Sequence, residues 1–394
     1  MLTNRARLMG VSRYCRQLVD QELAWWETIA INPWMGGQEM IEFYIKKAKN
    51  CDVKLFLWSN HSPSATVKRS FTGFWDMIST AGLLERVISL SIQAHPREFM
   101  TFLPLPSPLS NLKKLRIRNS DLHSNPASQW DSSTLHMLGS KHSLLQEHLP
   151  NLQHAWIEGL NPNVLGAGHS QFPHLTSLHY VGGEAECPKG AWLTPTIHTH
   201  QRITALTVDC GIDSFFQSNP AQVIHLPALV TLESLSSRWS QVLRTPALQK
   251  LVCYDSRFQS NALMSSWDHL EKLSIFVPSN AHSDWAVQSQ DGLTSDGIPN
   301  IRFLEFFLQL QQNPFRLPKM KQLRLLGVKK LDNSILLCLS AILQNPQRRH
   351  LKVIIPKSVI PRQLQNHFKS RSKIAVEERP LGDDEYDWVL TSRL

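Results

Sequence analysis

Few residues in this sequence have the types and the spacing that catalysis requires. His198 and His200 stand two positions apart, so an extended segment would place both imidazoles on one face, as two ligands of a metal ion can lie. No cysteine, aspartate or third histidine adjoins them to complete a ligand set. We therefore interpret them as two exposed side chains.

Two further chemical patterns are incomplete. Gly166–Ser170 loosely resembles a nucleophile turn, but its residues are not in the order G-x-S-x-G. The acidic run at 383–387 could attract a cation, yet it lacks the glycine and the spacing of a calcium loop. The sequence also contains none of the motifs of zinc hydrolases, phosphate-binding loops or dinucleotide folds. It predicts a protein that is not an enzyme and that binds neither a metal nor a cofactor.

Length and composition describe a chain that forms a hydrophobic core. Of 394 residues, 42% are hydrophobic and 19% are charged. The net charge of +9 is too dilute to indicate a nucleic-acid-binding protein unless the basic residues gather in one stripe. No apolar stretch is long enough for a membrane span, and no signal-like segment opens the chain. Six scattered cysteines without a C-x-x-C pair favour a reduced, intracellular compartment, either cytoplasm or nucleus.

A sequence motif recurs along the chain: an apolar residue, often followed by Pro, precedes the pattern L-x-x-L-x-(I/L/V). We call the residue at the first L of this pattern the lead residue. The lead residues are Val87, Leu112, Leu152, Leu175, Ile203, Leu229, Leu248, Leu270, Ile301, Met320 and Leu351. Most intervals between them fall in or near the period of leucine-rich repeats, about 20–29 residues. The chain is therefore predicted to be built from repeats.

After each lead residue the apolar positions alternate with polar ones, as in Leu115-Arg116-Ile117-Arg118. This alternation is typical of a short strand with one buried face. One such unit cannot bury its apolar face alone, so neighbours must stack. The predicted fold class is α/β, an irregular leucine-rich-repeat solenoid with parallel strands on its concave face. Helices are expected over 131–148 and 331–343, and a polar loop over 278–297.

The first thirty residues resemble the second half of an F-box, whose end typically reads V-C-x-x-W-x-x-(I/L)-A and then L-W-x-x-I. Val11, Leu18, Trp26 and Ile29 stand at matching positions. A helix expected at 40–44 and a strand expected at 52–57 extend the similarity to fungal F-box/leucine-rich-repeat proteins. By this resemblance, those four residues form an adaptor-binding segment that contacts a Skp-type adaptor protein.

The family's opening L-P-x-E-(I/V)-L helix does not occur in the sequence. Two interpretations of the helical N-terminal segment therefore stay open. It binds the adaptor, or it only caps the open apolar end of the repeats, which such arrays require. The domain organisation predicted from these features is the C-terminal half of an F-box-like segment at 1–30, a connecting helix and strand that form an N-terminal cap at 31–80, repeats at 81–356, and a C-terminal cap and tail at 357–394.

Polar and aromatic residues between the buried strand positions are expected to line the concave face. Lys114, Glu158 and His179 belong to this set. The residues predicted to bind a protein ligand there are Arg116, Arg118, Trp156, Tyr254, Phe276 and Phe307. Alternatively, the rings pack under loops or under each other. The function implied by the resemblance is a substrate receptor of an SCF-type (cullin–RING) ubiquitin ligase; the alternative is a stand-alone repeat scaffold that binds protein.

Overall fold

The structure is a computed structural model of the full chain. The residues that it describes are 9–22, 24, 26–31, 38–48, 51–58, 75–76, 78–80, 82–94, 108–119, 148–159, 172–181, 201–209, 224–234, 243–254, 267–276, 298–313, 315–326, 333–356, 374–381 and 385–392. They fall into two compact units. Unit 1 comprises residues 1–203 and 214–219, and unit 2 comprises residues 204–213 and 220–394.

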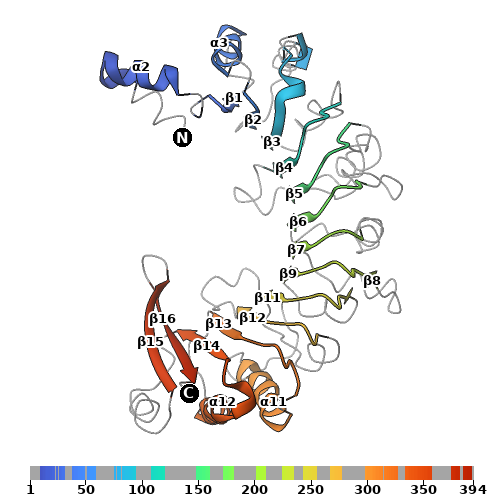
Figure 1. The fold of residues 1–394 in the computed structure, drawn as a ribbon, viewed down its shortest axis with the longest axis vertical. Helices are drawn as coiled ribbons and strands as arrows, with labels where there is room; N and C mark the ends of the chain where they lie inside the picture. The colour runs from blue at the N-terminus through green and yellow to red at the C-terminus, as the bar shows by residue number, and fades with distance from the viewer. Residues whose placement is uncertain are drawn as a thin grey trace. The chain divides into compact units, whose positions relative to one another are not determined.

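Unit 1 contains helices and strands in the first half of the chain (Figure 1). Its elements are α2 (Arg13–Gln21), β1 (Thr28–Ile31), α3 (Gln38–Ala48), β2 (Val53–Trp58), the short 3-10 helix η2 (Leu84–Arg86), β3 (Val87–Ala94), β4 (Lys114–Asn119), β5 (His154–Glu158) and β6 (Ser177–Val181). The strands pair in chain order, and each of the pairs from β1–β2 to β5–β6 is parallel. Unit 1 is thus an open parallel sheet with few helices.

Unit 2 continues the same pattern and ends differently. Its elements are β7 (Ala205–Asp209), β8 (Ile224–His225), β9 (Thr231–Ser234), β10 (Leu243–Arg244), β11 (Lys250–Tyr254), β12 (Lys272–Phe276), α11 (Ile298–Gln312), β13 (Gln322–Leu326), α12 (Asn333–Gln344), the 3-10 helix η6 (Pro346–Arg348), β14 (Lys352–Pro356), β15 (Ile374–Leu381) and β16 (Glu385–Ser392). Strands β7, β9, β11, β12, β13 and β14 pair in this order and are parallel. The hairpin of β15 and β16 then adds to β14 antiparallel, which covers the edge of that strand.

A hydrogen-bonded turn precedes most of the parallel strands. The amide of the lead residue donates to the carbonyl three positions earlier, at N···O distances from 2.9 to 3.2 Å. These carbonyl and amide pairs are Leu109–Leu112, Leu149–Leu152, Phe172–Leu175, Leu226–Leu229, Thr245–Leu248, Trp267–Leu270, Leu317–Met320 and Arg348–Leu351. Prolines such as Pro150 and Pro246 occupy the second position of the turn, where their fixed φ is favourable and no donor is needed. The recurring proline therefore belongs to the turn.

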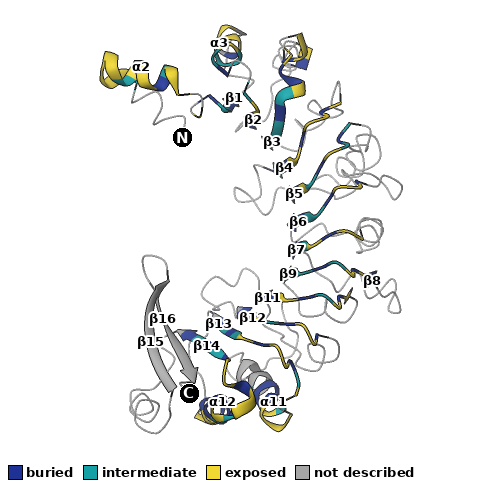
Figure 2. Ribbon diagram, in the orientation of Figure 1, coloured by how far each residue is buried: buried dark blue, intermediate teal, exposed yellow. Residues whose placement is uncertain are grey.

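Buried and more exposed positions alternate along most of the parallel strands, as the colours of the ribbon in Figure 2 show. In β4, Leu115 and Ile117 are buried while Lys114 and Arg116 are exposed. Leu178, Leu251 and Leu273 occupy the same buried register in their own strands. Together with the buried lead residues, these side chains form the apolar interior of each unit. The strand positions predicted from alternation are confirmed for every lead residue except Ile301.

Ile301 lies in helix α11 and precedes no strand, so the prediction of a strand there is wrong. Pro299 stands in the first turn of the helix, where a missing amide donor costs nothing. The residues that follow do not alternate: Phe306, Phe307 and Leu310 are buried at spacings of one, three and four. That spacing gives α11 an apolar stripe, with which it packs against α12.

Several other expectations can be compared with the elements. The helices expected at 40–44 and 331–343 correspond to α3 and α12, and the strand expected at 52–57 corresponds to β2. The expected helix at 131–148, except His148, and the expected loop at 278–297 lie outside the described residues. The N-terminal segment is only partly helical, because Thr28–Ile31 forms strand β1. No helix among the described residues is long and apolar enough to cross a membrane.

Candidate functional site

Side chains of β4, β5 and β6 on the side opposite the buried leucines form one row across neighbouring strands of unit 1, with Arg116 and Trp156 exposed and His179 partly buried. Arg116 pairs in register with Trp156, and Trp156 pairs in register with His179. Two register positions earlier, Lys114 pairs with His154. We call Lys114, Arg116, Arg118, Trp156 and His179 the basic–aromatic cluster. Parallel pairing brings these residues together from segments of the chain that lie far apart in sequence.

Trp156 is the centre of this cluster. The residue is 37% exposed, which leaves part of a large apolar side chain in water. The guanidinium carbon of Arg116 lies 4.5 Å from the indole centroid, in cation–π geometry. The His179 ring lies 3.6 Å from the indole centroid at an interplanar angle of 31°. Because β5 lies between β4 and β6, these two neighbours approach the indole from opposite strands, and they fix its orientation.

Glu158 lies at the far end of β5 and holds both arginines. Its Oε1 is 3.1 Å from Nε of Arg118, and its Oε2 is 3.7 Å from Nη2 of Arg116. The Glu158 side chain is only 12% exposed, whereas that of Arg116 is 45% exposed. The carboxylate therefore sits beneath the guanidinium groups, and Arg116 keeps a solvent-facing edge with donors to offer.

Positive charge dominates the cluster. Of the strand residues that the structure describes from β3 to β6, Glu158 is the only acidic one, against Lys114, Arg116 and Arg118. Burial lowers the pKa of His154, and the positive charge of Lys114 lowers it further. The contribution of Lys114 has the sign that a positive local potential produces at a histidine. The face can accept an anionic partner.

The structure brings together only part of the predicted concave-face set. Arg116, Arg118 and Trp156 are adjacent in unit 1. Phe307 does not belong with them: it is fully buried in α11, where its ring lies 5.3 Å from that of Phe306, so its placement on a strand face is corrected. Tyr254 and Phe276 pair in register at the ends of β11 and β12, and their side chains lie outside what the structure describes.

Sequence reasoning found the exposed residues but missed how they combine. The aromatic partner of Trp156 is His179, and the counter-ion of the two arginines is Glu158. Aligning the repeats at their lead residues would have placed these groups side by side, because Leu112, Leu152 and Leu175 each stand two residues before a strand. The reach of the side chains across strands was not readable from the alignment.

The four F-box-like residues separate into two pairs. Val11 and Leu18 are exposed, by 71% and 48%, around the amphipathic helix α2. Trp26 and Ile29 are buried: Ile29 is part of β1, and the Trp26 indole N–H donates to the Val19 carbonyl at 2.8 Å. A predicted adaptor contact at these two residues conflicts with their burial: Ile29 is a buried position of β1, and the Trp26 ring packs against Phe43 and Tyr44 of α3.

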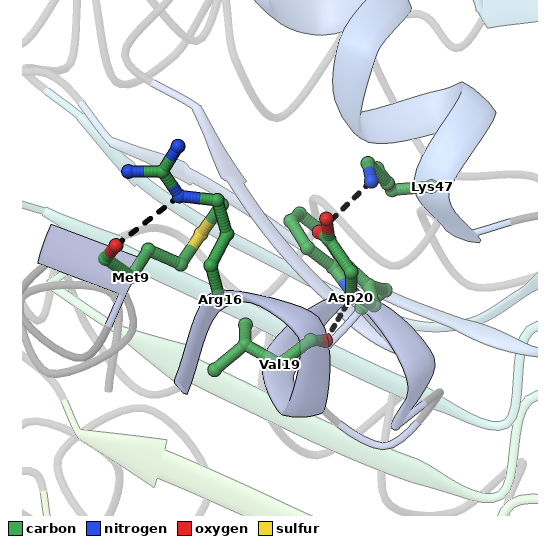
Figure 3. A network of polar contacts seen from close by, with 6 residues as sticks. Met9, Arg16, Val19, Asp20 and Lys47 are labelled. Atoms are coloured by element: carbon green, nitrogen blue, oxygen red, sulfur yellow. Dashed lines mark hydrogen bonds and ion pairs between the residues drawn. The ribbon is translucent and has the colours of Figure 1, made fainter. Parts of the chain in front are cut away.

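Polar contacts hold α2 in place around this buried indole (Figure 3). Lys47 Nζ of α3 lies 2.8 Å from Oδ1 of Asp20 in α2 and 5.5 Å from the Trp26 ring centroid. Arg16 Nε donates to the Met9 carbonyl at 3.3 Å. Helix α2 starts at a capping serine, Ser12, whose hydroxyl oxygen accepts from the Cys15 amide at 3.0 Å. The helix is thereby fixed with Leu18 outward and Val19 inward.

Other candidate chemistry lies mostly outside the described residues. His198, His200 and the Gly166–Ser170 turn belong to this undescribed part, as do Asp383 and Asp384. Within the described ranges, no group of three or more His, Cys, Asp or Glu side chains is placed to hold a metal ion. The basic–aromatic cluster is consequently the site that the described residues define best.

No protein-family model matches the chain, and no curated protein is similar to it.

Proposed function

We propose that the protein is a non-catalytic recognition protein that binds another protein through the basic–aromatic cluster of unit 1. The observation that carries this proposal is Trp156, a partly exposed indole held between Arg116 and His179 on an open strand face. Tryptophan and arginine are the residues most enriched at the energetic centres of protein interfaces. A rigid side chain also loses little conformational entropy on binding.

The repeating turn and strand supports a scaffold of this kind. Successive parallel strands present their exposed residues in register, so one ligand can contact several repeats at once. In the leucine-rich-repeat solenoid that the sequence predicts, this face would be the concave one. The proposal depends only on the register in which β3 to β6 pair, and not on the solenoid.

Capture with the full chain as bait tests recognition. Proteins recovered by the wild type are compared with those recovered by Trp156→Ala and by Phe315→Ala, a control that removes an exposed aromatic ring from unit 2. We expect at least one protein to be lost with Trp156→Ala and retained with Phe315→Ala, and then to bind the wild type when both are purified. Recovery that does not depend on Trp156 contradicts the proposal.

A more specific form of this function is a substrate receptor of an SCF-type ubiquitin ligase, in which α2 binds a Skp-type adaptor. The supporting observation is the exposure of Tyr14 and Leu18, four residues apart on α2, and of Val11 just before the Ser12 cap of that helix. Such a receptor would hold its target near the ubiquitin-charged enzyme and raise the target's effective concentration there. The alternative is the stand-alone scaffold, in which this segment binds no adaptor.

A pull-down with a purified Skp-type adaptor separates the receptor from the scaffold. Trp26 is unsuitable as the test residue because its burial means that a substitution would disturb the fold. The informative variant is Val11→Asp/Leu18→Asp, with Gln17→Asp as a control on the exposed part of the same helix. Adaptor binding that is lost only in the double variant supports the receptor. Absence of binding by the wild type leaves the scaffold.

A further inference from the structure

The basic–aromatic cluster has an unbalanced charge at its surface. Glu158 is oriented toward Arg118 at 3.1 Å and is more distant from Arg116 at 3.7 Å. Arg116 is the more exposed of the two arginines, and Lys114, two residues earlier on the same side of β4, is exposed as well. The buried carboxylate is thus directed mainly to one of three cations, and the other two face solvent.

The neighbouring strand on the other side supplies neutral polar groups. Ser89, Ser91 and Gln93 of β3 pair in register with Lys114, Arg116 and Arg118. Hydroxyl and amide groups can donate to an anionic ligand but cannot neutralise the lysine and arginine beside them. The surface that can bind an anion therefore extends from β3 to β5, with Arg116 at its centre.

We propose that this face binds an acidic peptide segment of the partner, with Lys114 and Arg116 pairing to its side-chain carboxylates or phosphate groups beside the Trp156 indole. This inference rests on the proposed function and gives its ligand a chemical class. Arg116 is already oriented by the indole, so a planar carboxylate or a phosphate can accept from its free edge without further ordering of the side chain.

The same geometry favours a peptide over a nucleic acid. Proteins that bind single-stranded nucleic acids use exposed aromatic faces on which bases stack. The Trp156 indole is approached by Arg116 from β4 and by His179 from β6, so a base would have to displace one of them. An extended peptide needs no open ring face; it can contact the indole edge while its acidic side chains meet the cations.

Fluorescence anisotropy with the full chain tests this inference. The probes are a labelled twelve-residue peptide of alternating Glu and Ser, the same peptide with Gln in place of Glu, that Gln peptide with phosphoserine at half of its Ser positions so that its charge is similar to that of the Glu peptide, and a twelve-nucleotide single-stranded DNA. We expect the Glu peptide, the phosphoserine peptide or both to bind at least tenfold more tightly than the Gln peptide. A stronger response to phosphoserine would identify phosphate as the anion, and a stronger response to Glu would identify carboxylate.

The decisive variant is Lys114→Gln/Arg116→Gln, and the matched control is Lys250→Gln/Lys272→Gln. Both remove two positive charges, and the control lysines are exposed at the starts of β11 and β12 in unit 2. We expect the first variant to weaken binding of the acidic peptide about tenfold or more, and the control to change it less than twofold. The reverse variant, Lys114→Glu/Arg116→Glu, should instead bind a labelled Lys-Ser peptide. An unchanged thermal midpoint in each variant shows that the fold is retained.

Three results would overturn the inference: equal losses in the decisive and control variants, failure of both acidic peptides to bind, or DNA binding that exceeds peptide binding and depends on Lys114 and Arg116. If the acidic peptides fail while Trp156-dependent protein capture persists, the ligand class is wrong and the proposed recognition function stands. If neither acidic-peptide binding nor Trp156-dependent capture is observed, the ligand class and the proposed recognition function are both wrong.

Discussion

The indole N–H of Trp267 donates a hydrogen bond of 3.1 Å to the hydroxyl oxygen of Thr245, and both side chains are buried. The two residues occupy equivalent positions in successive repeats: each is the first residue of the turn, whose carbonyl accepts the hydrogen bond of the turn. In other repeats this position is occupied by leucine, as at Leu149 and Leu226. A polar threonine replaces an apolar residue at this position, and the next repeat supplies the donor that satisfies it. The pair links two turns through their side chains.

Replacing Thr245 by valine keeps the side-chain shape and removes the acceptor. The buried indole N–H then has lost this partner, so we expect Thr245→Val to lower the free energy of unfolding by about 1–3 kcal/mol. Thr245→Ser, which keeps the hydroxyl, should retain the hydrogen bond. Denaturant unfolding of Thr245→Val, Trp267→Phe and the double variant measures the coupling. Additive effects would show that the hydrogen bond contributes nothing beyond packing.

Arg348 is a second polar residue at the same place in the repeat. It is buried, its burial lowers the pKa of its guanidinium, and its Nη2 donates to the Arg316 carbonyl. Leucine is the residue at this position in several other repeats, so we expect Arg348→Leu to raise stability by about 0.5–2 kcal/mol. Arg348→Lys, which buries a more strongly hydrated ammonium, should lower it. Thermal and denaturant unfolding measure both; a large loss with leucine would show that the guanidinium is required.

Most of the parallel strands could be predicted because two local signals coincide at them. A turn that starts with a buried residue and often continues with proline is followed by strict alternation, as at Leu149-Pro150 before β5. Ile298-Pro299-Asn300-Ile301 contains the first signal without the second. The apolar residues after Ile301 have helical spacing, and the segment forms helix α11 instead of a strand. Phe307 lies on the buried side of this helix.

The site was predictable in composition but not in geometry. Alternation alone shows that Arg116 and Trp156 share the exposed side of their strands. Their contact at 4.5 Å depends on which strands are neighbours, and the burial of Glu158 depends on side-chain reach. At the N-terminus, matching a motif by residue type did not separate the exposed Leu18 from the buried Trp26, because the burial of Trp26 depends on contacts with Phe43 and Tyr44 of α3, which lie outside the motif.

Glu158→Gln should change stability and ligand binding in opposite directions. Glutamine keeps the size of the side chain but removes the negative charge that faces Arg116 and Arg118. We therefore expect the free energy of unfolding to fall by about 1 kcal/mol. This is less than for a fully buried ion pair, because both arginines are partly exposed. The same change leaves the cations less neutralised and should tighten binding of an acidic peptide. The exposed pair Glu27–Lys54, 3.4 Å apart, provides a control: Glu27→Gln should alter neither property measurably. Weaker peptide binding by Glu158→Gln would contradict the electrostatic account of the site.

His154 reports the potential of the cluster directly. Its pKa is lowered first by burial and then by Lys114, so Lys114→Gln should raise the pKa of His154 and Lys114→Arg should not. NMR titration of the His154 ring measures this shift. Because the folded state binds its proton less readily than the unfolded state, the wild type should lose stability as the pH falls below the unfolded histidine value of about 6.5, and Lys114→Gln should lose less. A His154 pKa that is insensitive to Lys114 would show that the cation does not impose the positive potential on which acidic-peptide binding depends.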